Sequence, residues 1–104
     1  DVKGCYVLLP NSCVIWEKIK NYIDLELKKR NVENYYFPLF VTKENLQKEQ
    51  KHLDGFTAEV AWIKDSALAI RPTSECIICP IMSKYIKSYN DLPKKVNQWA
   101  NIVR

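Results

Sequence analysis

A short polar turn between two apolar runs constrains the fold of this chain more than any other feature. An apolar run at 67–70 precedes the sequence RPTSE (71–75), and a second apolar run, 76–86, follows it. The proline disfavours a helical backbone at the arginine before it. Thr73 or Ser74 is a good helix N-cap, and the glutamate would complement the helix dipole in the first turn. The pattern therefore predicts a strand, a tight turn and a helix.

Two roles are open for the polar side chains of this turn. They can act only as helix-capping groups. Alternatively, Thr73 and Glu75 can hold a positively charged amine of a ligand, because an unpaired charge inside a pocket is expensive. The turn by itself is compatible with both roles.

Size and composition set the class of protein. A chain of 104 residues makes at most one small domain, and 47% apolar residues indicate a globular chain rather than a disordered one. No stretch approaches the ~18 apolar residues of a membrane span, and the first residues do not form a signal-peptide pattern. The net charge of +4 permits a polyanion partner without requiring one. We therefore expect a cytoplasmic protein with no membrane association.

The cysteines are predicted to be reduced thiols, which agrees with a cytosolic compartment. Cys76 and Cys79 form a C-x-x-C pair, but a zinc site needs two more ligands and the single histidine is His52. Both cysteines lie in an apolar helical pattern, where small buried thiols pack well. No structural metal is predicted. The four cysteines are Cys5, Cys13, Cys76 and Cys79.

Segment 11–30 has the pattern of a long amphipathic helix. Pro10 marks its start, three basic residues at 28–30 fall in its last turn, and Asn31 can take the left-handed closing conformation. Its apolar residues recur at helical spacing and form one face. These residues are Ile15, Ile19, Tyr22, Ile23 and Leu27.

The other segments give weaker signals. The run 34–41 predicts a strand in which Pro38 marks an edge or an end, and Thr42 is expected to cap a polar helix at 43–51. Pro80 is expected to kink the helix 76–86. The alternating pattern at 96–104 predicts a last strand. One face of that strand would carry Val96, Gln98, Ala100, Ile102 and Arg104.

Four stretches, in this order, carry a resemblance that covers nearly the whole chain. They are GCYVLLP (4–10), WEKIKNYIDLELKKRNVENYYFPLFV (16–41), GFTAEVAWI (55–63), and LAIRPTSE (68–75) with LPKKVNQWANIVR (92–104). Together they resemble prolyl-tRNA synthetase of the eukaryotic and archaeal type, a class II aminoacyl-tRNA synthetase. The resemblance implies an α+β fold (α/β in the broad sense), part of the class II antiparallel-sheet catalytic fold. Residues 1–104 would be a partial catalytic domain containing the long motif 1 helix, the proline-binding TxE loop and the start of motif 2.

The resemblance implies roles for individual residues. Thr73 and Glu75 match the pair that binds the imino group of proline. Arg104 matches the motif 2 arginine, a catalytic residue whose planar fork suits a carboxylate and a phosphate oxygen at once. Phe56 could form an apolar wall for the pyrrolidine ring, although Phe56 could equally be core. Positions close to the ligand and ATP are matched by Glu59 and Val60, and Val60 and Trp62 could also be core.

The resemblance also implies substrates and an interface. The expected reaction is ATP-dependent activation of L-proline, followed by its transfer to tRNA(Pro), with Mg²⁺ accompanying ATP. The motif 1 helix and the following strand would form a homodimer interface. Its predicted residues are Trp16, Ile19, Ile23, Tyr36 and Pro38.

Departures from the family leave a second reading open. Motif 3, the rest of motif 2 and the anticodon-binding domain have no counterpart here, so the chain is expected to be an inactive fragment of a larger enzyme. The connection at 64–67 is shorter than the family's usual polar loop, and Leu9 stands where the family often has arginine. The alternative is a non-catalytic, synthetase-derived module for RNA binding or dimerisation. Retention of Thr73, Glu75 and Arg104 together favours the enzyme.

Overall fold

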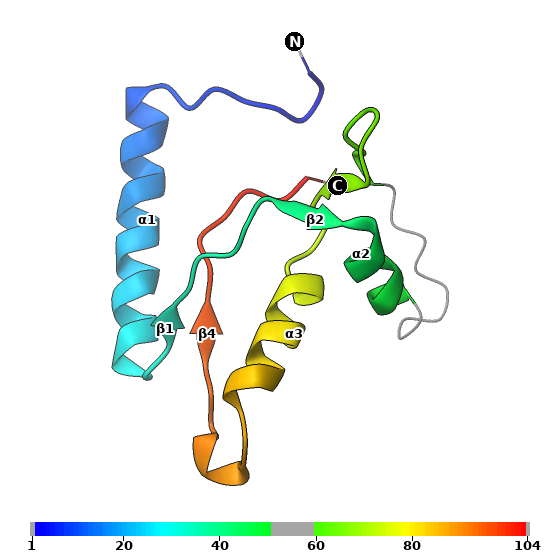
Figure 1. Ribbon diagram of the computed structural model, residues 1–104. Coiled ribbons are helices and arrows are strands. Elements are labelled where there is room, and N and C mark those ends of the chain that lie inside the picture. Colours follow the sequence, from blue (N-terminus) through cyan, green and yellow to red (C-terminus); the bar gives the residue numbers. More distant parts are fainter. Residues whose placement is uncertain (1, 51–59, 104) are drawn as a thin grey trace. The chain divides into compact units, whose positions relative to one another are not determined.

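The structure is a computed structural model, and it describes residues 2–50 and 60–103. The chain divides into two compact units, Asp1–Glu33 and Asn34–Arg104. Figure 1 shows its elements in chain order. They are α1 (Pro10–Lys29), β1 (Glu33–Asn34), β2 (Phe40–Thr42), α2 (Lys43–Gln50), β3 (Leu68–Ile70), α3 (Glu75–Tyr85), a 3₁₀ helix (Tyr89–Asp91) and β4 (Val96–Asn97).

The first unit contains α1, which agrees closely with the predicted helix. Pro10 occupies the first turn, where its missing N–H costs nothing. At the other end, Asn31 has φ of 58° and its N–H donates to the carbonyl of Lys28 at 3.0 Å. Arg30 and Glu26 form an ion pair one turn apart at 2.8 Å. The predicted left-handed closure at Asn31 is therefore confirmed.

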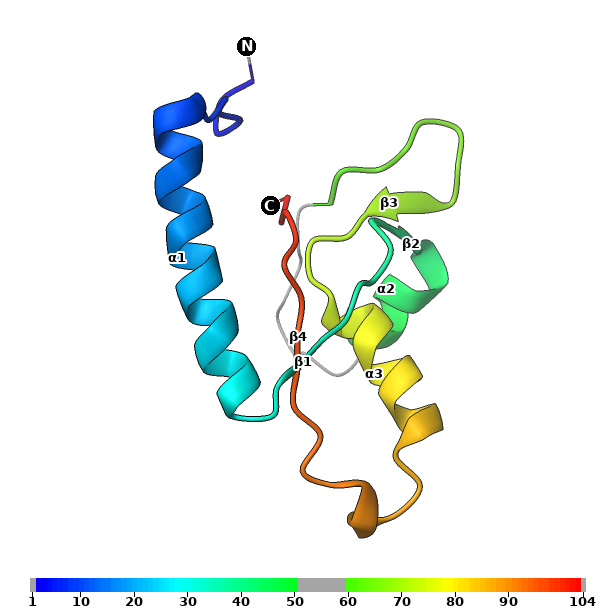
Figure 2. The same cartoon turned by 90° about the vertical axis from the view of Figure 1, so that its left-hand side faces the viewer.

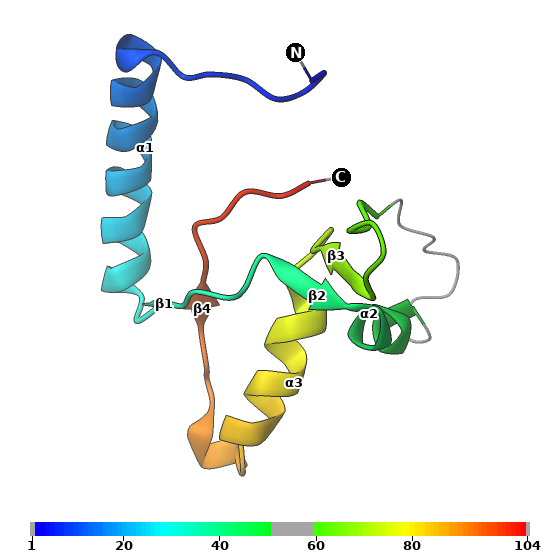
Figure 3. The ribbon, with the colours of Figure 1, turned by 45° about the horizontal axis from the view of Figure 1, so that its top comes forward.

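The second unit is built around a small antiparallel sheet. β2 pairs with β3, placing Val41 opposite Ala69. On the other edge of β3, Trp62 bridges to Ala69, so β3 lies between two extended segments. Figure 3 shows β2 and β3 side by side, with α2 following β2 directly. The strand predicted before the RPTSE turn is confirmed.

A tight turn connects Trp62 to β3. Ile63 donates its N–H to Leu68 O at 2.9 Å, and Ser66 donates to Ile63 O at 3.3 Å. Asp65 has φ of 59°, a conformation that aspartate tolerates better than most residues. The short connection at 64–67 is therefore a closed hairpin.

The core of the second unit lies where α2 and α3 meet this sheet. Val41, Leu46, Ala69 and Cys76 are buried together, and Val60 and Ile77 pack against them. Cys76 is only 1% exposed, whereas Cys79 is exposed. Of the C-x-x-C pair, Cys76 thus has the packing role that the sequence favoured.

Capping of α2 also follows the prediction. The N–H of Asn45 donates to Oγ1 of Thr42 at 3.2 Å. The hydroxyl satisfies one of the amides that a helix N-terminus leaves without an internal partner. Within the described residues, α2 extends as far as Gln50.

Two strand predictions are wrong in extent. The segment 34–41 is divided between β1, which ends at Asn34, and β2, which begins at Phe40. Pro38 lies in the gap and has no N–H to donate, and the N–H of Phe37 goes to the side-chain Oε1 of Gln98 at 3.0 Å. These backbone groups therefore do not continue a ladder.

The second of these predictions is the strand at 96–104. Within the described residues, regular pairing covers only Val96–Asn97, where Tyr35 donates its N–H to Asn97 O at 2.8 Å. Because β1 is itself short, β4 has little backbone to pair with. β1 and β4 form a two-stranded sheet of their own.

Among the described helices, none is both long and apolar enough to cross a membrane.

Candidate functional site

The RPTSE loop joins β3 to α3, as Figure 2 shows. At its start, Arg71 donates its backbone N–H to Leu39 O at 2.9 Å, which holds the loop to the segment before β2. Exposure then rises along the loop. Arg71 and Pro72 are buried, Thr73 and Ser74 are half-buried, and Glu75 is exposed. The loop therefore carries the chain from the core to the surface and presents its last polar groups there.

The hydroxyls of this loop do not cap the helix. Ser74 is the N-cap residue of α3, but its backbone is helical (φ −95°, ψ −13°) and its side chain makes no capping hydrogen bond. The carbonyl of Ser74 accepts from Ile77 and Ile78 instead. The sequence predicted the position of the cap and was wrong about the side-chain bond, because a residue already in the helical region cannot turn its hydroxyl back onto the first turn.

Thr73 and Glu75 are available to a ligand. Within the described part of the chain, neither the Thr73 hydroxyl nor the Glu75 carboxylate has a hydrogen-bond or ion-pair partner. The carbonyl of Thr73 accepts from the Cys76 thiol at 3.5 Å, which ties the loop to the core. A hydroxyl and a carboxylate two residues apart are suitable acceptors for an ammonium group.

Arg71 is a functional candidate that the sequence reasoning missed. Its side chain is only 4% exposed, and its guanidinium donates to three backbone carbonyls. The usable signal was a cation placed directly after an apolar strand, next to a proline that leaves little freedom to turn outward. Arginine is rarely buried unless it is paired, so such a position indicates that the fold supplies hydrogen-bond acceptors for the guanidinium.

The other predicted site residues have different outcomes. Phe56, Glu59 and Arg104 lie outside the described residues. Val60 is half-buried and packs against the core cluster, so core packing accounts for its burial. Of the predicted substrate residues, the structure describes only Thr73 and Glu75 together at one loop. No group of three metal-ligating side chains occurs among the described residues.

The residues predicted for an interface are accessible. Trp16, Ile19 and Ile23 on α1 are 47%, 55% and 39% exposed, and none of the helix's residues is buried. In the second unit Tyr36 is 84% exposed, and Pro38 is exposed too.

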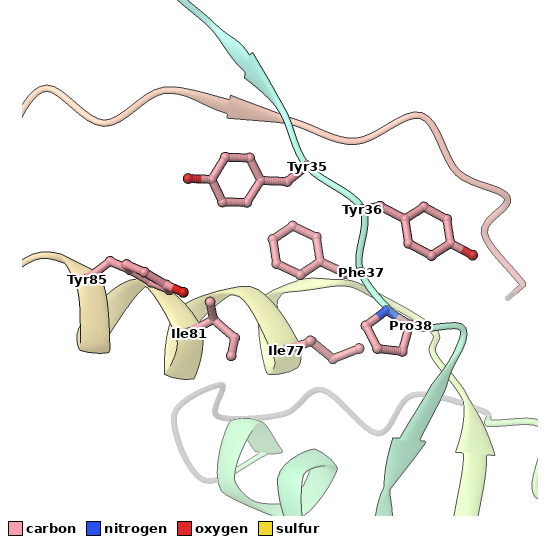
Figure 4. A pocket seen from close by; sticks show the side chains of 7 residues that line it. All are labelled: Tyr35, Tyr36, Phe37, Pro38, Ile77, Ile81 and Tyr85. Carbon is pink, nitrogen blue, oxygen red and sulfur yellow. The ribbon is translucent and has the colours of Figure 1, made fainter.

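An apolar pocket of about 470 Å³ lies between α3 and the segment that connects β1 to β2. Figure 4 shows Phe37, Ile77 and Ile81 facing one another across it. The aromatic run of that segment and the apolar stripe of α3 were both visible in the sequence. The sequence did not show that these two apolar surfaces lie next to each other. The lining residues are Tyr35, Tyr36, Phe37, Pro38, Ile77, Ile81 and Tyr85.

Comparison with solved structures gives the class of protein. The fold matches a prolyl-tRNA synthetase from Cryptosporidium parvum, complexed with halofuginone and AMPPNP, with a TM-score of 0.86 and 47% identity over the whole chain. A second structure from that organism, complexed with L-proline and AMP, gives 0.85 and 45%. The chain covers 22% and 21% of those two chains. It therefore has the α+β fold of a segment of a class II aminoacyl-tRNA synthetase.

Sequence relatives show which enzymes contain a homologous segment. The chain is 49% identical over its whole length to the bifunctional glutamate/proline–tRNA ligase of Mus musculus and to the cytoplasmic proline–tRNA ligase of Arabidopsis thaliana. It is 44% identical to the proline–tRNA ligase of Clostridium novyi. The chain spans 7%, 21% and 23% of the lengths of these relatives. No family model matches. Over its entire length, the chain is homologous to one segment of the prolyl-tRNA synthetases.

Proposed function

We propose that the protein to which this chain belongs is a proline–tRNA ligase, and that the chain supplies part of its catalytic domain. In this proposal the enzyme activates L-proline with ATP and transfers it to tRNA(Pro). The observation that carries the proposal is the RPTSE loop. Its Thr73 hydroxyl and Glu75 carboxylate have no partner among the described residues, in a chain homologous to proline–tRNA ligases throughout.

The loop would bind the amine end of proline. The secondary ammonium group has two N–H donors, and Thr73 and Glu75 offer a neutral and an anionic acceptor. A charge-assisted bond to the carboxylate contributes roughly 1.5–3 kcal/mol. Phe56 would cover the pyrrolidine ring, and Glu59 and Val60 would lie near the ligand. A crystal structure of the C. parvum homologue contains L-proline and AMP, which supports a site for proline beside a nucleotide in this family.

Arg104 would act at the other end of the substrate. A carboxylate oxygen of proline attacks the α-phosphorus of ATP, and the bond to the bridging oxygen breaks to release pyrophosphate. Arg104 would hold that carboxylate and an α-phosphate oxygen, which positions the reactants and stabilises the developing charge. A terminal hydroxyl of tRNA(Pro) then attacks the carbonyl of the adenylate. AMP leaves, and the hydroxyl proton is lost to solvent.

In this proposal, Mg²⁺ binds only together with ATP. The described residues provide no cluster of ligands that could bind the ion. Magnesium commonly keeps several waters and binds through substrate phosphates rather than in an all-protein cage. We therefore assign no residue of this chain to it.

The proposed enzyme is a cytoplasmic homodimer. The exposed apolar residues Trp16, Ile19 and Ile23 of α1, together with Tyr36 and Pro38, are the proposed contact surface. An aromatic and aliphatic surface of this kind is typical of the buried part of obligate interfaces. The relative from A. thaliana is a cytoplasmic enzyme, which supports the location.

The test is proline-dependent exchange of pyrophosphate into ATP by the full-length protein. We expect exchange with L-proline and none above background with alanine, cysteine or threonine. Absence of exchange, combined with salt-sensitive binding of tRNA, would instead favour an RNA-binding module. Exchange with another amino acid would contradict the proposed substrate.

A further inference from the structure

We infer that Arg71 is a positioning residue that holds the RPTSE loop in its working geometry by fastening it to two other segments of the same compact unit. The catalytic consequence of this inference rests on the proposed function. The fastening itself is a property of the structure and can be measured without substrates.

The guanidinium of Arg71 connects segments that are far apart in sequence. Nη1 donates to the carbonyls of Phe37 at 3.2 Å and Pro38 at 2.5 Å, and Nη2 donates to the carbonyl of Asn101 at 3.4 Å. The backbone N–H of Arg71 adds a bond to Leu39 O at 2.9 Å. One residue thus links the loop to the segment before β2 and to the segment after β4.

Burial makes these bonds difficult to replace. The Arg71 side chain is 4% exposed, and among the described residues no carboxylate pairs with it. Its charge is therefore balanced by carbonyl dipoles, and releasing them would leave buried donors unsatisfied. Nε already has no partner within the described part of the chain. A lysine has a single nitrogen and cannot reproduce a fork that reaches opposite segments.

The linked segments are those that carry the proposed proline site. Arg71 precedes Thr73 by two residues and Glu75 by four, and the rigid ring of Pro72 transmits its position. Asn101 precedes Arg104 by three residues. Gln98 reinforces the same junction, because its Oε1 accepts from the N–H of Phe37 at 3.0 Å. Misplacement of a substrate-binding group by about 1 Å can cost on the order of 100-fold in rate.

The competing explanation is that Arg71 only stabilises the core. The two explanations differ in what a variant does to the correctly folded molecules. A core residue changes how many molecules are folded, and leaves their affinity for proline unchanged. A positioning residue changes the Michaelis constant for proline in every folded molecule.

The experiment compares Arg71→Lys and Arg71→Met with wild type in the full-length protein. Lys48→Met is the matched control, since Lys48 is an exposed cation on α2 in a surface ion pair with Glu44. Active sites are titrated by the burst of prolyl-adenylate. Hydrogen exchange of segments 71–76 and 98–103 is followed by mass spectrometry without substrates.

We expect the proline KM of Arg71→Lys to rise by about tenfold, and the KM of Arg71→Met to rise further. Both segments should exchange faster, and Lys48→Met should match wild type in both readouts. Unchanged exchange in both segments, or an unchanged proline KM with only fewer active sites, would overturn the inference. If Arg71→Met does not fold, Arg71→Lys decides. Should the wild type fail to use proline, the proposed function fails, and the exchange rates still decide whether Arg71 fastens the loop.

Discussion

Glu75 stands at the first position of α3 with an exposed carboxylate. This location has two effects that can be separated. The carboxylate complements the helix dipole, and it remains available to a cation because no ion pair occupies it within the described residues. A substitution that keeps the shape and removes the charge tests the second effect.

Glu75→Gln should raise the KM for proline by roughly 10- to 100-fold, which corresponds to the loss of one charge-assisted hydrogen bond. The KM for ATP should stay within about threefold. Steady-state pyrophosphate exchange at varied proline and varied ATP measures both constants. Glu44→Gln is the matched control, because it removes an exposed carboxylate on α2. Equal loss for the two substrates would remove the assignment of Glu75 to proline.

Sequence reasoning at this scale found the polar loop and missed its anchor. Thr73 and Glu75 could be identified because a hydroxyl and a carboxylate at a strand–helix turn form a short pattern with a known chemistry. The position of Arg71 directly after an apolar strand was visible, but its role was not, since the carbonyls of Phe37, Pro38 and Asn101 that it contacts are 30 or more positions away along the chain. The sequence does not indicate which distant carbonyls will accept hydrogen bonds from a buried guanidinium.

The α2 helix shows what a local pattern can determine. Its cap is one hydroxyl on one amide, Thr42 Oγ1 and Asn45 N, separated by three residues. Thr42→Ala should therefore reduce the free energy of local opening of α2 by about 1 kcal/mol. Hydrogen exchange of the α2 amides in the full-length protein measures this. Thr42→Ser keeps the acceptor and should exchange at nearly the wild-type rate; an equally large effect of serine would mean that packing, not capping, is responsible.

The 3₁₀ helix contains a second local cap, which depends on pH. Asp91 Oδ2 accepts from the backbone N–H groups of Lys87 at 2.7 Å and Ser88 at 3.1 Å, and these bonds lower the pKa of Asp91. A lowered folded-state pKa means that the stabilisation is present above the unfolded value of about 3.9 and is lost as pH falls through the folded value.

The Asp91 carboxyl should therefore titrate below the ordinary aspartate pKa. NMR of protein labelled with ¹³C-aspartate measures the midpoint, and the signal that disappears in Asp91→Asn identifies the residue. The stabilisation of the turn should begin to decline below the unfolded aspartate value and be lost once the pH is below that midpoint. A midpoint at or above the ordinary aspartate value would contradict the capping role.

The sequence could not determine the extent of the strands at 34–41 and 96–104. Helix α1 was predicted to within one residue at each end because its periodicity, its proline and its asparagine are all local. The strand patterns at 34–41 and 96–104 were present, but pairing needs a partner backbone. Pro38 interrupts the segment 34–41, and the N–H of Phe37 beside it donates to the side chain of Gln98 instead of to a strand. Alternation shows where a strand can form and not whether its ladder is completed.

At the scale of the whole molecule, the distribution of apolar surface is uneven. The second unit has a small buried core, whereas α1 buries none of its residues. Trp16, Ile19 and Ile23 are each more than a third exposed on this helix. The chain spans at most 23% of the length of the relatives described above. The proposed homodimer assigns the apolar face of α1 to a second copy.

Charges on this face should therefore prevent the proposed dimer from forming. We expect the double variant Ile19→Glu with Ile23→Glu to sediment as a monomer at a concentration where wild type is a dimer, because charged residues are depleted from the cores of such interfaces. Gln47→Glu adds negative charge on exposed α2 and should leave the dimer intact. Circular dichroism shows whether the double variant keeps its helix content. A folded double variant that remains dimeric, or a wild type that is monomeric at micromolar concentration, would contradict the proposed interface. Dissociation together with loss of proline-dependent exchange would further show that activation depends on the pairing of two copies.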